Sequence, residues 1–131
     1  MLPRSRVILY LEDNERLQEL IRDVLEFAGW HVKPSPDSVL SWAMLDCTKE
    51  HFDLLLLDHE IRGISGLELT RRVRRMSHRK GTPIILISLE DLTEEAREAG
   101  ADAFLRKPNN LIELVDTIRR LLPASADAAP E

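Results

Sequence analysis

Residues 52–58 read Phe52-Asp53-Leu54-Leu55-Leu56-Leu57-Asp58, which is four consecutive leucines followed by a carboxylate. An uninterrupted apolar run of this length indicates a strand that is buried on both faces, as in the centre of a parallel sheet. Asp58 ends the run, at the place where open α/β sheets carry their binding groups. A lone aspartate there is more often a cap for the next turn, so its meaning depends on the rest of the chain.

Other segments of strand length also end on polar side chains. Val7–Leu11 precedes Glu12 and Asp13, Pro83–Ile87 precedes Ser88, and Ala103–Arg106 precedes Lys107. A shorter candidate, Trp30–Lys33, is stopped by Pro34. In a parallel sheet the carboxyl ends of all strands lie on one edge. Residues as far apart in the sequence as Glu12 and Lys107 are therefore predicted to converge.

Helical segments separate these strands, and each begins or ends at a recognisable residue. The predicted helices run from Asn14 to Gly29, from Asp37 or Ser38 to about Glu50, from Gly66 into the basic stretch Arg71–Lys80, from Thr93 to Ala99, and from Asn110 to about Leu122. Strands that alternate with helices in this way predict an α/β fold whose parallel sheet carries helices on both faces.

The second predicted helix has an apolar face made of Val39, Leu40, Ala43, Met44 and Cys47. Because these residues recur at helical spacing, the face is predicted to pack inward. Cys47 is the only cysteine, so the chain can form neither an internal disulfide nor a metal site of several cysteines. It is predicted to lie in or near a core. The basic stretch of the third helix is predicted to be a solvated face.

Composition bounds the class of protein. The chain has 131 residues, 44% of them hydrophobic, which suits one globular domain. We expect residues 1–122 to form that domain and 123–131 to be a disordered tail or the stub of a linker. No apolar run approaches the ~20 residues of a membrane span, and the start lacks a signal-peptide pattern, so a cytoplasmic protein is expected. A net charge of −5 disfavours broad nucleic-acid binding.

The strand ends combine three carboxylates, one hydroxyl and one ammonium group. Crowded carboxylates repel one another unless a cation joins them. The strand ends offer oxygen ligands without cysteine or histidine, so the fitting metal is a hard cation, Mg²⁺. A lysine is a compact point charge suited to a phosphoryl group, and a serine hydroxyl can donate to a further phosphoryl oxygen. The set predicts a site for an aspartate, a metal and a phosphoryl group.

From Val7 to Leu122 this pattern resembles the response-regulator receiver domains of two-component signalling, the CheY-like superfamily. The resemblance implies a flavodoxin-like (βα)5 fold, a doubly wound parallel five-stranded sheet of strand order 2-1-3-4-5. It also implies a phosphoacceptor that catalyses its own phosphorylation and dephosphorylation, with no separate substrate. Such a domain accepts its phosphoryl group in a Mg²⁺-dependent reaction and changes the surface of the fourth helix and fifth strand to signal to a partner.

The resemblance assigns roles in phosphoryl transfer and switching to matching residues. Asp58 matches the phosphoacceptor, and Lys107 matches the lysine that contacts the phosphoryl group. Ser88 matches the switch hydroxyl, and Phe104 matches the aromatic residue that turns inward when the hydroxyl moves. The Lys107–Pro108 bond is similar to one that is cis in this family.

The resemblance also implies a set of magnesium ligands. Asp13 matches the direct ligand, and Glu12 matches the neighbouring acid that holds the metal through water. Asp58 and the backbone carbonyl of Glu60 complete the protein ligands. Apart from the repulsion considered below, the Glu60 side chain itself is expected to have no role.

Three features depart from the family pattern. Arg62 stands four residues after Asp58, where a proline is common. Leu89 follows the switch hydroxyl, where alanine or glycine is usual. The segment from Ser88 to Lys107 is about three residues short of the usual spacing, nearly one helical turn, so the fourth helix or the loop before it is expected to be abbreviated.

These departures motivate a hypothesis and the first of two alternative functions; the second rests on Glu60, an acid two residues after Asp58. Leu89, with Glu60 and Glu90, is predicted to slow phosphoryl exchange by steric shielding and repulsion. One alternative is a degenerate receiver that acts as a phosphorylation-independent protein-interaction module. The other is a phosphohydrolase with Asp58 as a turnover nucleophile, which the lack of a visible cap domain disfavours. Fold resemblance alone does not decide between them.

The resemblance implies partners as well. A histidine kinase or phosphotransfer protein is expected to dock near Asn14–Leu17 and on the loop after Lys107. The signal would pass to a separate output partner or to an output domain beyond residue 131, and a homodimer is allowed. No nucleic acid and no membrane is expected to bind this domain.

Overall fold

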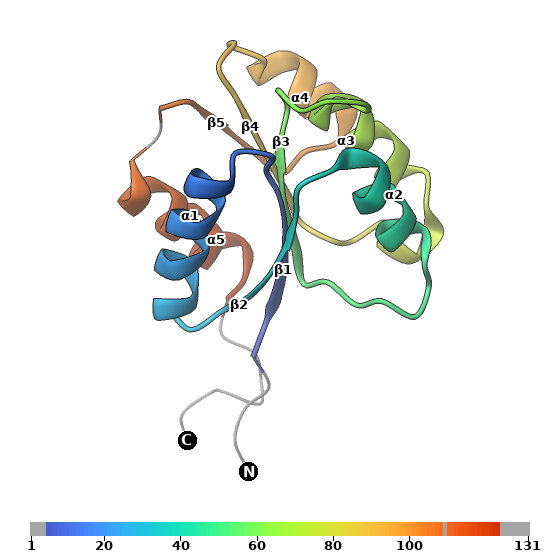
Figure 1. Cartoon of the computed structure of the whole chain (residues 1–131). Helices are drawn as coiled ribbons and strands as arrows, with labels where there is room; N and C mark the ends of the chain where they lie inside the picture. The colour runs from blue at the N-terminus through green and yellow to red at the C-terminus, as the bar shows by residue number, and fades with distance from the viewer. Residues whose placement is uncertain (1–4, 109, 124–131) are drawn as a thin grey trace.

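The computed structural model describes residues 5–108 and 110–123. Strands and helices alternate along it (Figure 1). The strands are β1 (Val7–Leu11), β2 (His31–Ser35), β3 (Leu54–Asp58), β4 (Ile84–Ser88) and β5 (Ala103–Arg106). The helices are α1 (Glu15–Phe27), α2 (Ser38–Asp46), α3 (Gly66–Arg74), the 3-10 turn η1 (Ser77–Arg79), α4 (Thr93–Ala99) and α5 (Leu111–Leu121). The predicted tail falls almost wholly on residues 124–131, which lie outside the described residues.

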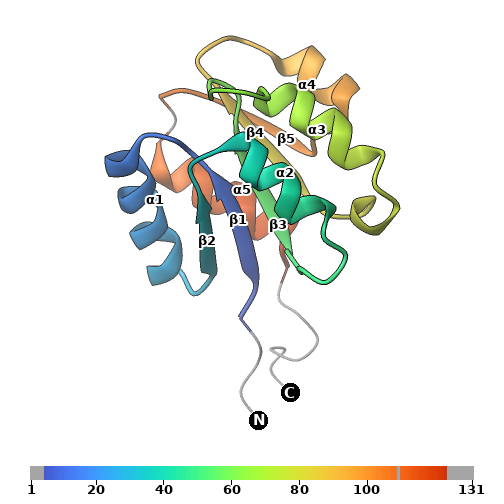
Figure 2. The same cartoon turned by 45° about the vertical axis from the view of Figure 1, so that its right-hand side comes forward.

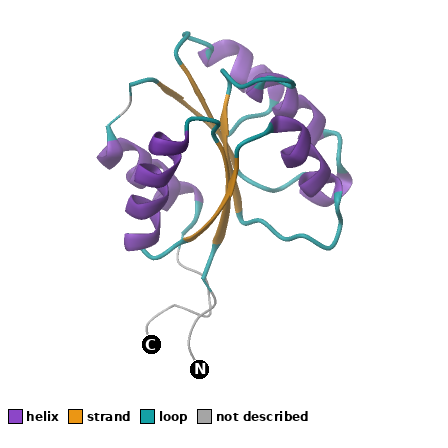
Figure 3. Cartoon of the chain, in the orientation of Figure 1, coloured by secondary structure: helices purple, strands orange, loops and turns teal. Residues whose placement is uncertain are grey.

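The five strands form one sheet of order β2-β1-β3-β4-β5, and every neighbouring pair is parallel. Helices α1 and α5 cover one face of the sheet, and α2, α3 and α4 cover the other (Figures 2 and 3). The flavodoxin-like fold and the strand order are therefore confirmed. Within the described chain, no helix has both the length and the apolar character needed to cross a membrane.

The sheet has an apolar cluster on each of its faces. Ile8, Leu54 and Leu56 belong to the cluster beneath α1 and α5, whereas Leu55 and Leu57 belong to the cluster beneath α2, α3 and α4. Successive strand residues point to opposite faces, so a central strand covered on both sides must be apolar throughout. All five residues of β3 are buried, which accounts for the unbroken leucine run.

Strand β2 extends further than the sequence predicted. The predicted strand was to stop before Pro34, but it continues to Ser35, and Pro34 lies opposite Tyr10 of β1. Strand β2 is the outermost strand on its side of the sheet. An edge strand tolerates proline because half of its N–H groups point away from the single neighbouring strand.

Helix α2 corrects two predictions. It ends at Asp46 rather than near Glu50. Its predicted apolar face is largely exposed, including Val39, Leu40 and Cys47, and the residues that it buries are Ser38, Ser41 and Leu45.

The two serines can face inward because their hydroxyl groups are paired. Ser38 Oγ donates to the carbonyl oxygen of Arg62 at 2.8 Å and accepts from the N–H of Ile64 at 2.7 Å. Ser41 Oγ lies 2.6 Å from Ser35 Oγ. A buried hydroxyl that is hydrogen-bonded costs little, so this helix fastens the loop after β3 through polar contacts.

The basic stretch Arg71–Lys80, which begins within α3, is only partly a solvated face, and this corrects a further prediction. Arg71 and Arg75 are exposed, but Arg79 is only 3% exposed. Its guanidinium donates to the carbonyl oxygens of Leu45 and Cys47, both at 3.0 Å. The last carbonyl groups of a helix have no hydrogen-bond partners within the helix. Arg79 donates to two such carbonyl oxygens at the end of α2.

Two segments distant in sequence meet at the edge of the sheet where the strands begin. Arg6 precedes β1, and one of its guanidinium nitrogens donates to the carbonyl oxygen of Pro123 at 3.3 Å. Pro123 follows α5, so the first strand and the last helix are joined there. This edge is opposite the one on which the strands end.

Candidate functional site

The carboxyl ends of four strands bring the predicted site residues together. In the registers of the sheet Leu11 pairs with Leu57, Asp58 with Ile87, and Ser88 with Arg106. Because neighbouring strands end level with one another, the residues that follow them share one edge. Glu12, Asp13, Asp58, Ser88 and Lys107 all stand at this edge, as the strand pattern predicted.

Three carboxylates form an acidic cluster. One carboxylate oxygen from each of Glu12, Asp13 and Asp58 can be chosen so that all lie within 4.8 Å of one another. Glu12 and Asp58 are 4% and 2% exposed, whereas Asp13 is exposed. Burial in the first place, and the neighbouring Asp58 carboxylate in addition, raise the pKa of Glu12 to about 7. The group holds only oxygen donors, which suits a hard divalent cation such as Mg²⁺.

Lys107 supplies the positive charge of the site. Its Nζ lies 2.8 Å from Oδ2 of Asp58 and 3.8 Å from Oε1 of Glu60. Burial acts to lower the pKa of Lys107, but Asp58, Glu12 and Glu60 outweigh it, so this pKa is raised above its ordinary value and the side chain stays charged. The following Lys107–Pro108 bond is cis, which confirms that prediction.

Glu60 places its side chain in the site, where the sequence predicted only a repulsive effect and no contacts for it. Its Oε2 accepts from Ser88 Oγ at 2.5 Å, and its Oε1 accepts from the N–H of Leu89 at 3.0 Å. Burial acts to raise the pKa of Glu60, but these donors and Lys107 outweigh it, so the pKa is lowered. A loop carries no periodic pattern that fixes side-chain direction. The one sequence signal was an acid two residues after Asp58.

Ser88 and Phe104 lie on neighbouring strands. Ser88 is fully buried, and its Oγ also accepts from the N–H of Glu90 at 3.0 Å. Phe104 pairs with Leu86 in the register of the sheet and is half-buried against the cluster beneath α2, α3 and α4. Leu89, which was predicted to shield the site, has its side chain more than half exposed, and its N–H is the part that contacts Glu60.

The loop after β3 is packed closely against Asp58. A Cβ added to Gly66 would lie 2.5 Å from the backbone oxygen of Asp58, so only glycine fits there without a shift of the backbone. Gly63 has a φ of +90°, which side-chain-bearing residues rarely adopt. The two glycines therefore allow the loop to fold back against the strand end, where the N–H of Glu60 donates to Oδ1 of Asp58 at 3.1 Å.

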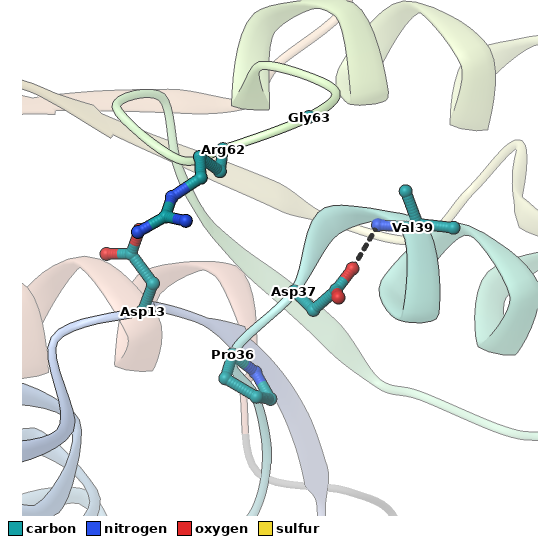
Figure 4. A pocket seen from close by; sticks show the side chains of 6 residues that line it. All are labelled: Asp13, Pro36, Asp37, Val39, Arg62 and Gly63. Carbon is teal, nitrogen blue, oxygen red and sulfur yellow. Dashed lines mark hydrogen bonds between the residues drawn. The ribbon is translucent and has the colours of Figure 1, made fainter.

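A pocket of about 540 Å³ opens beside Asp13 (Figure 4). Asp13, Pro36, Asp37, Val39, Arg62 and Gly63 line it. Arg62 extends its guanidinium group toward Asp13 (Figure 4). Asp37 instead caps α2, because its Oδ1 accepts from the N–H of Val39 at 2.7 Å (Figure 4). The residue found where the family commonly has proline thus places a second cation beside the acidic cluster.

Comparison with known proteins identifies the family. The chain matches the response regulator receiver domain family over residues 8–119. The chain therefore belongs to that family, the CheY-like receivers of two-component signalling. The match spans β2 to β5 completely and nearly all of β1 and α5.

Relatives agree with this assignment. The polar-differentiation response regulator DivK of Brucella ovis is 27% identical over 122 residues, which cover 90% of this chain and 97% of DivK. The chemotaxis protein CheY4 of Vibrio cholerae is 26% identical, with a TM-score of 0.81 and coverage of 90% and 99%. The receiver domain of the sensor histidine kinase PA1611 from Pseudomonas aeruginosa is 25% identical, with a TM-score of 0.81 and coverage of 92% and 100%. Its structure has a magnesium ion coordinated in the active-site cleft.

Proposed function

We propose that this receiver accepts a phosphoryl group on Asp58 from a histidine kinase or a phosphotransfer protein and acts as a signalling switch. The observation that carries the proposal is the buried Asp58 carboxylate, which lies 2.8 Å from the Lys107 ammonium beside two further acids. A pairing of this kind, surrounded by donors at one edge of a parallel sheet, suits a phosphoryl group better than a generic structural ion pair.

The transfer exchanges one bond for another. A carboxylate oxygen of Asp58 attacks phosphorus, and the bond from phosphorus to the donor breaks, so that the donor leaves with the electron pair. Lys107 offsets negative charge on the phosphoryl oxygens. The N–H of Glu60, which donates to Oδ1 of Asp58 at 3.1 Å, helps to orient the attacking carboxylate. The product is an aspartyl phosphate that needs no other covalent partner in the protein.

Glu12, Asp13, Asp58 and the backbone carbonyl of Glu60 are the groups that we expect to hold Mg²⁺. When bound, the ion would supply further positive charge to the phosphoryl oxygens. The acidic cluster supports this assignment because burial and repulsion from Asp58 raise the pKa of Glu12 to about 7. A divalent cation bound among the three carboxylates would offset their mutual repulsion.

Phosphorylation would act through the Ser88 hydroxyl. The modification adds roughly −1.5 to −2 charges, judged from other phosphorylated side chains. Ser88 would move toward the new oxygens and Phe104 would follow, which would change the surface formed by α4 and β5. The shift in population can be no larger than the preference of the phosphoryl group for the active state.

The test is the mass of the intact protein after incubation with acetyl phosphate, with Mg²⁺ or with EDTA. We expect wild type to gain one phosphoryl group with Mg²⁺ only, and Asp58→Asn to gain none, because the substitution removes the attacking oxygen. A histidine kinase phosphorylated in vitro serves as a second donor. The absence of label from both donors, together with the absence of Mg²⁺ binding, would instead favour a phosphorylation-independent interaction module.

A further inference from the structure

The carboxylate of Glu60 is surrounded by donors at the strand ends. Oε2 accepts from the Ser88 hydroxyl at 2.5 Å, and Oε1 accepts from the N–H of Leu89 at 3.0 Å. The same Oε1 lies 3.8 Å from Nζ of Lys107. Both oxygens are thus engaged by groups that come from β4 and β5, although Glu60 itself belongs to the loop after β3.

Ser88 and Lys107 are the groups that the proposed function needs for the phosphoryl group. The Ser88 hydroxyl has one proton, so it cannot donate to Glu60 and to a phosphoryl oxygen at the same time. Lys107 lies 3.8 Å from Glu60, beyond a hydrogen bond, but its charge would be shared between Glu60 and the phosphoryl group. We propose that Glu60 is an internal competitor of the phosphoryl group, and that its release of Ser88 and Lys107 limits the rate at which Asp58 is phosphorylated. This inference rests on the proposed function and assigns a rate-controlling residue to it.

The geometry of Lys107 explains why the competition matters. The ammonium group lies between the carboxylates of Asp58 and Glu60, at 2.8 Å and 3.8 Å. An arriving phosphoryl group brings further negative charge next to Asp58, where Glu60 would repel it. The Glu60 side chain is 29% exposed and stands on a loop, so it can leave toward solvent when the phosphoryl group takes its donors.

Glu90 offers a matched control. One carboxylate oxygen of Glu90 can lie within 4.8 Å of one from Glu60, so its charge is close to the same site. In the described part of the chain, however, only its backbone N–H contacts Ser88, and this contact does not depend on the side chain. Glu90→Gln therefore removes a nearby charge and leaves the engaged donors untouched.

The experiment compares wild type, Glu60→Ala, Glu60→Gln and Glu90→Gln. The rate of phosphorylation by acetyl phosphate with Mg²⁺ is followed by intact mass. We expect both Glu60 variants to gain label about tenfold faster than wild type, which corresponds to about 1.4 kcal/mol in the barrier. The sequence hypothesis gave Glu90 a repulsive effect as well, but its charge is exposed and screened, so Glu90→Gln should stay within about twofold of wild type.

A second measurement is independent of bond formation to phosphorus. Beryllofluoride has the shape and charge of a phosphoryl group, and its binding with Mg²⁺ is followed by fluorine NMR. We expect Glu60→Ala to lower its dissociation constant about tenfold relative to both wild type and Glu90→Gln, the change that one charge-assisted contact is worth.

The outcomes separate this inference from the function on which it rests. If wild type is phosphorylated on Asp58 but the Glu60 variants are no faster than Glu90→Gln and bind beryllofluoride no more tightly, then Glu60 is not a competitor and the proposed function stands. If neither wild type nor any variant is labelled or binds beryllofluoride, the proposed function fails, and the competition between Glu60 and the phosphoryl group fails with it.

Discussion

A second aspartate shows how the same residue type serves stability rather than chemistry. Asp53 precedes β3, so it stands at the end of the strand opposite Asp58. Its carboxylate accepts from the N–H of Val7 at 2.7 Å and from His51 at 2.9 Å, and it pairs with Arg6 at 3.5 Å. Burial acts to raise the pKa of Asp53, but these partners outweigh it and lower the pKa below its ordinary value of 3.8.

This lowered pKa predicts a dependence of stability on pH. A carboxyl group whose pKa is lower in the folded state stabilises the protein above the pKa of the unfolded chain, and the contribution is lost as pH falls through the folded value. We expect Asp53→Asn to lower the free energy of unfolding by about 1 kcal/mol at pH 7. The difference should shrink below about pH 4 in urea unfolding. The exposed Asp23→Asn is the control, and an unchanged difference at low pH would contradict the assignment.

At the residue scale, the sequence predicted the strand-end groups and a repulsive effect of Glu60, but not the contacts of its side chain with Ser88 and Leu89. The convergence of Glu12, Asp58, Ser88 and Lys107 follows from a rule of parallel sheets, which needs only the strand boundaries. The direction of the Glu60 side chain depends instead on how the loop after β3 folds back on the strand end. That path is set by tertiary contacts such as the pairing of Ser38 with Arg62 and Ile64, which no local pattern encodes.

At the scale of elements, helices were predicted well where their own residues include the cap that starts the helix. Asn14 caps α1 by accepting from the N–H of Leu17, and Asn110 caps α5 by accepting from the N–H of Glu113. Helix α4 has the predicted bounds and is only seven residues long. The prediction for helix α2 was wrong because most of its regularly spaced apolar side chains face solvent. The serines that it buries instead form hydrogen bonds with residues of other segments.

The end of α2 supports a prediction about stability. Arg79→Met would keep most of the side-chain volume but remove the guanidinium that donates to the carbonyl oxygens of Leu45 and Cys47. Leu45 would keep His78 Nε2 at 2.8 Å and Cys47 would keep the N–H of Glu50 at 3.4 Å. We therefore expect a loss of about 1–2 kcal/mol in the free energy of unfolding, from two hydrogen bonds to a charged donor. Urea denaturation measures the loss. Arg75→Met removes an exposed arginine nearby, and equal effects of the two substitutions would show that Arg79 does not cap the helix.

At the scale of the whole molecule, the central position of β3 links stability with function. Leucines of β3 contribute to the apolar clusters on both faces of the sheet, and the same strand ends on Asp58. A buried strand holds its terminal carboxylate in a fixed position, which suits a site that relies on positioning. The order of the strands came from family resemblance, because spacing along the chain does not distinguish one parallel order from another.

The contact between Arg6 and Pro123 has a consequence for engineering this domain. The Arg6 guanidinium reaches the carbonyl oxygen of Pro123 at 3.3 Å, so the two backbone segments lie within the length of one arginine side chain. A short peptide could join them, and new ends could be opened between the exposed residues Thr48 and Lys49. We expect this circular permutant to unfold cooperatively and to keep Mg²⁺-dependent labelling of Asp58, measured by urea denaturation and intact mass. A permutant that folds without gaining label would show that the backbone path is tied to the site. A successful one would make the receiver an insertable cassette for building phosphorylation control into a host protein.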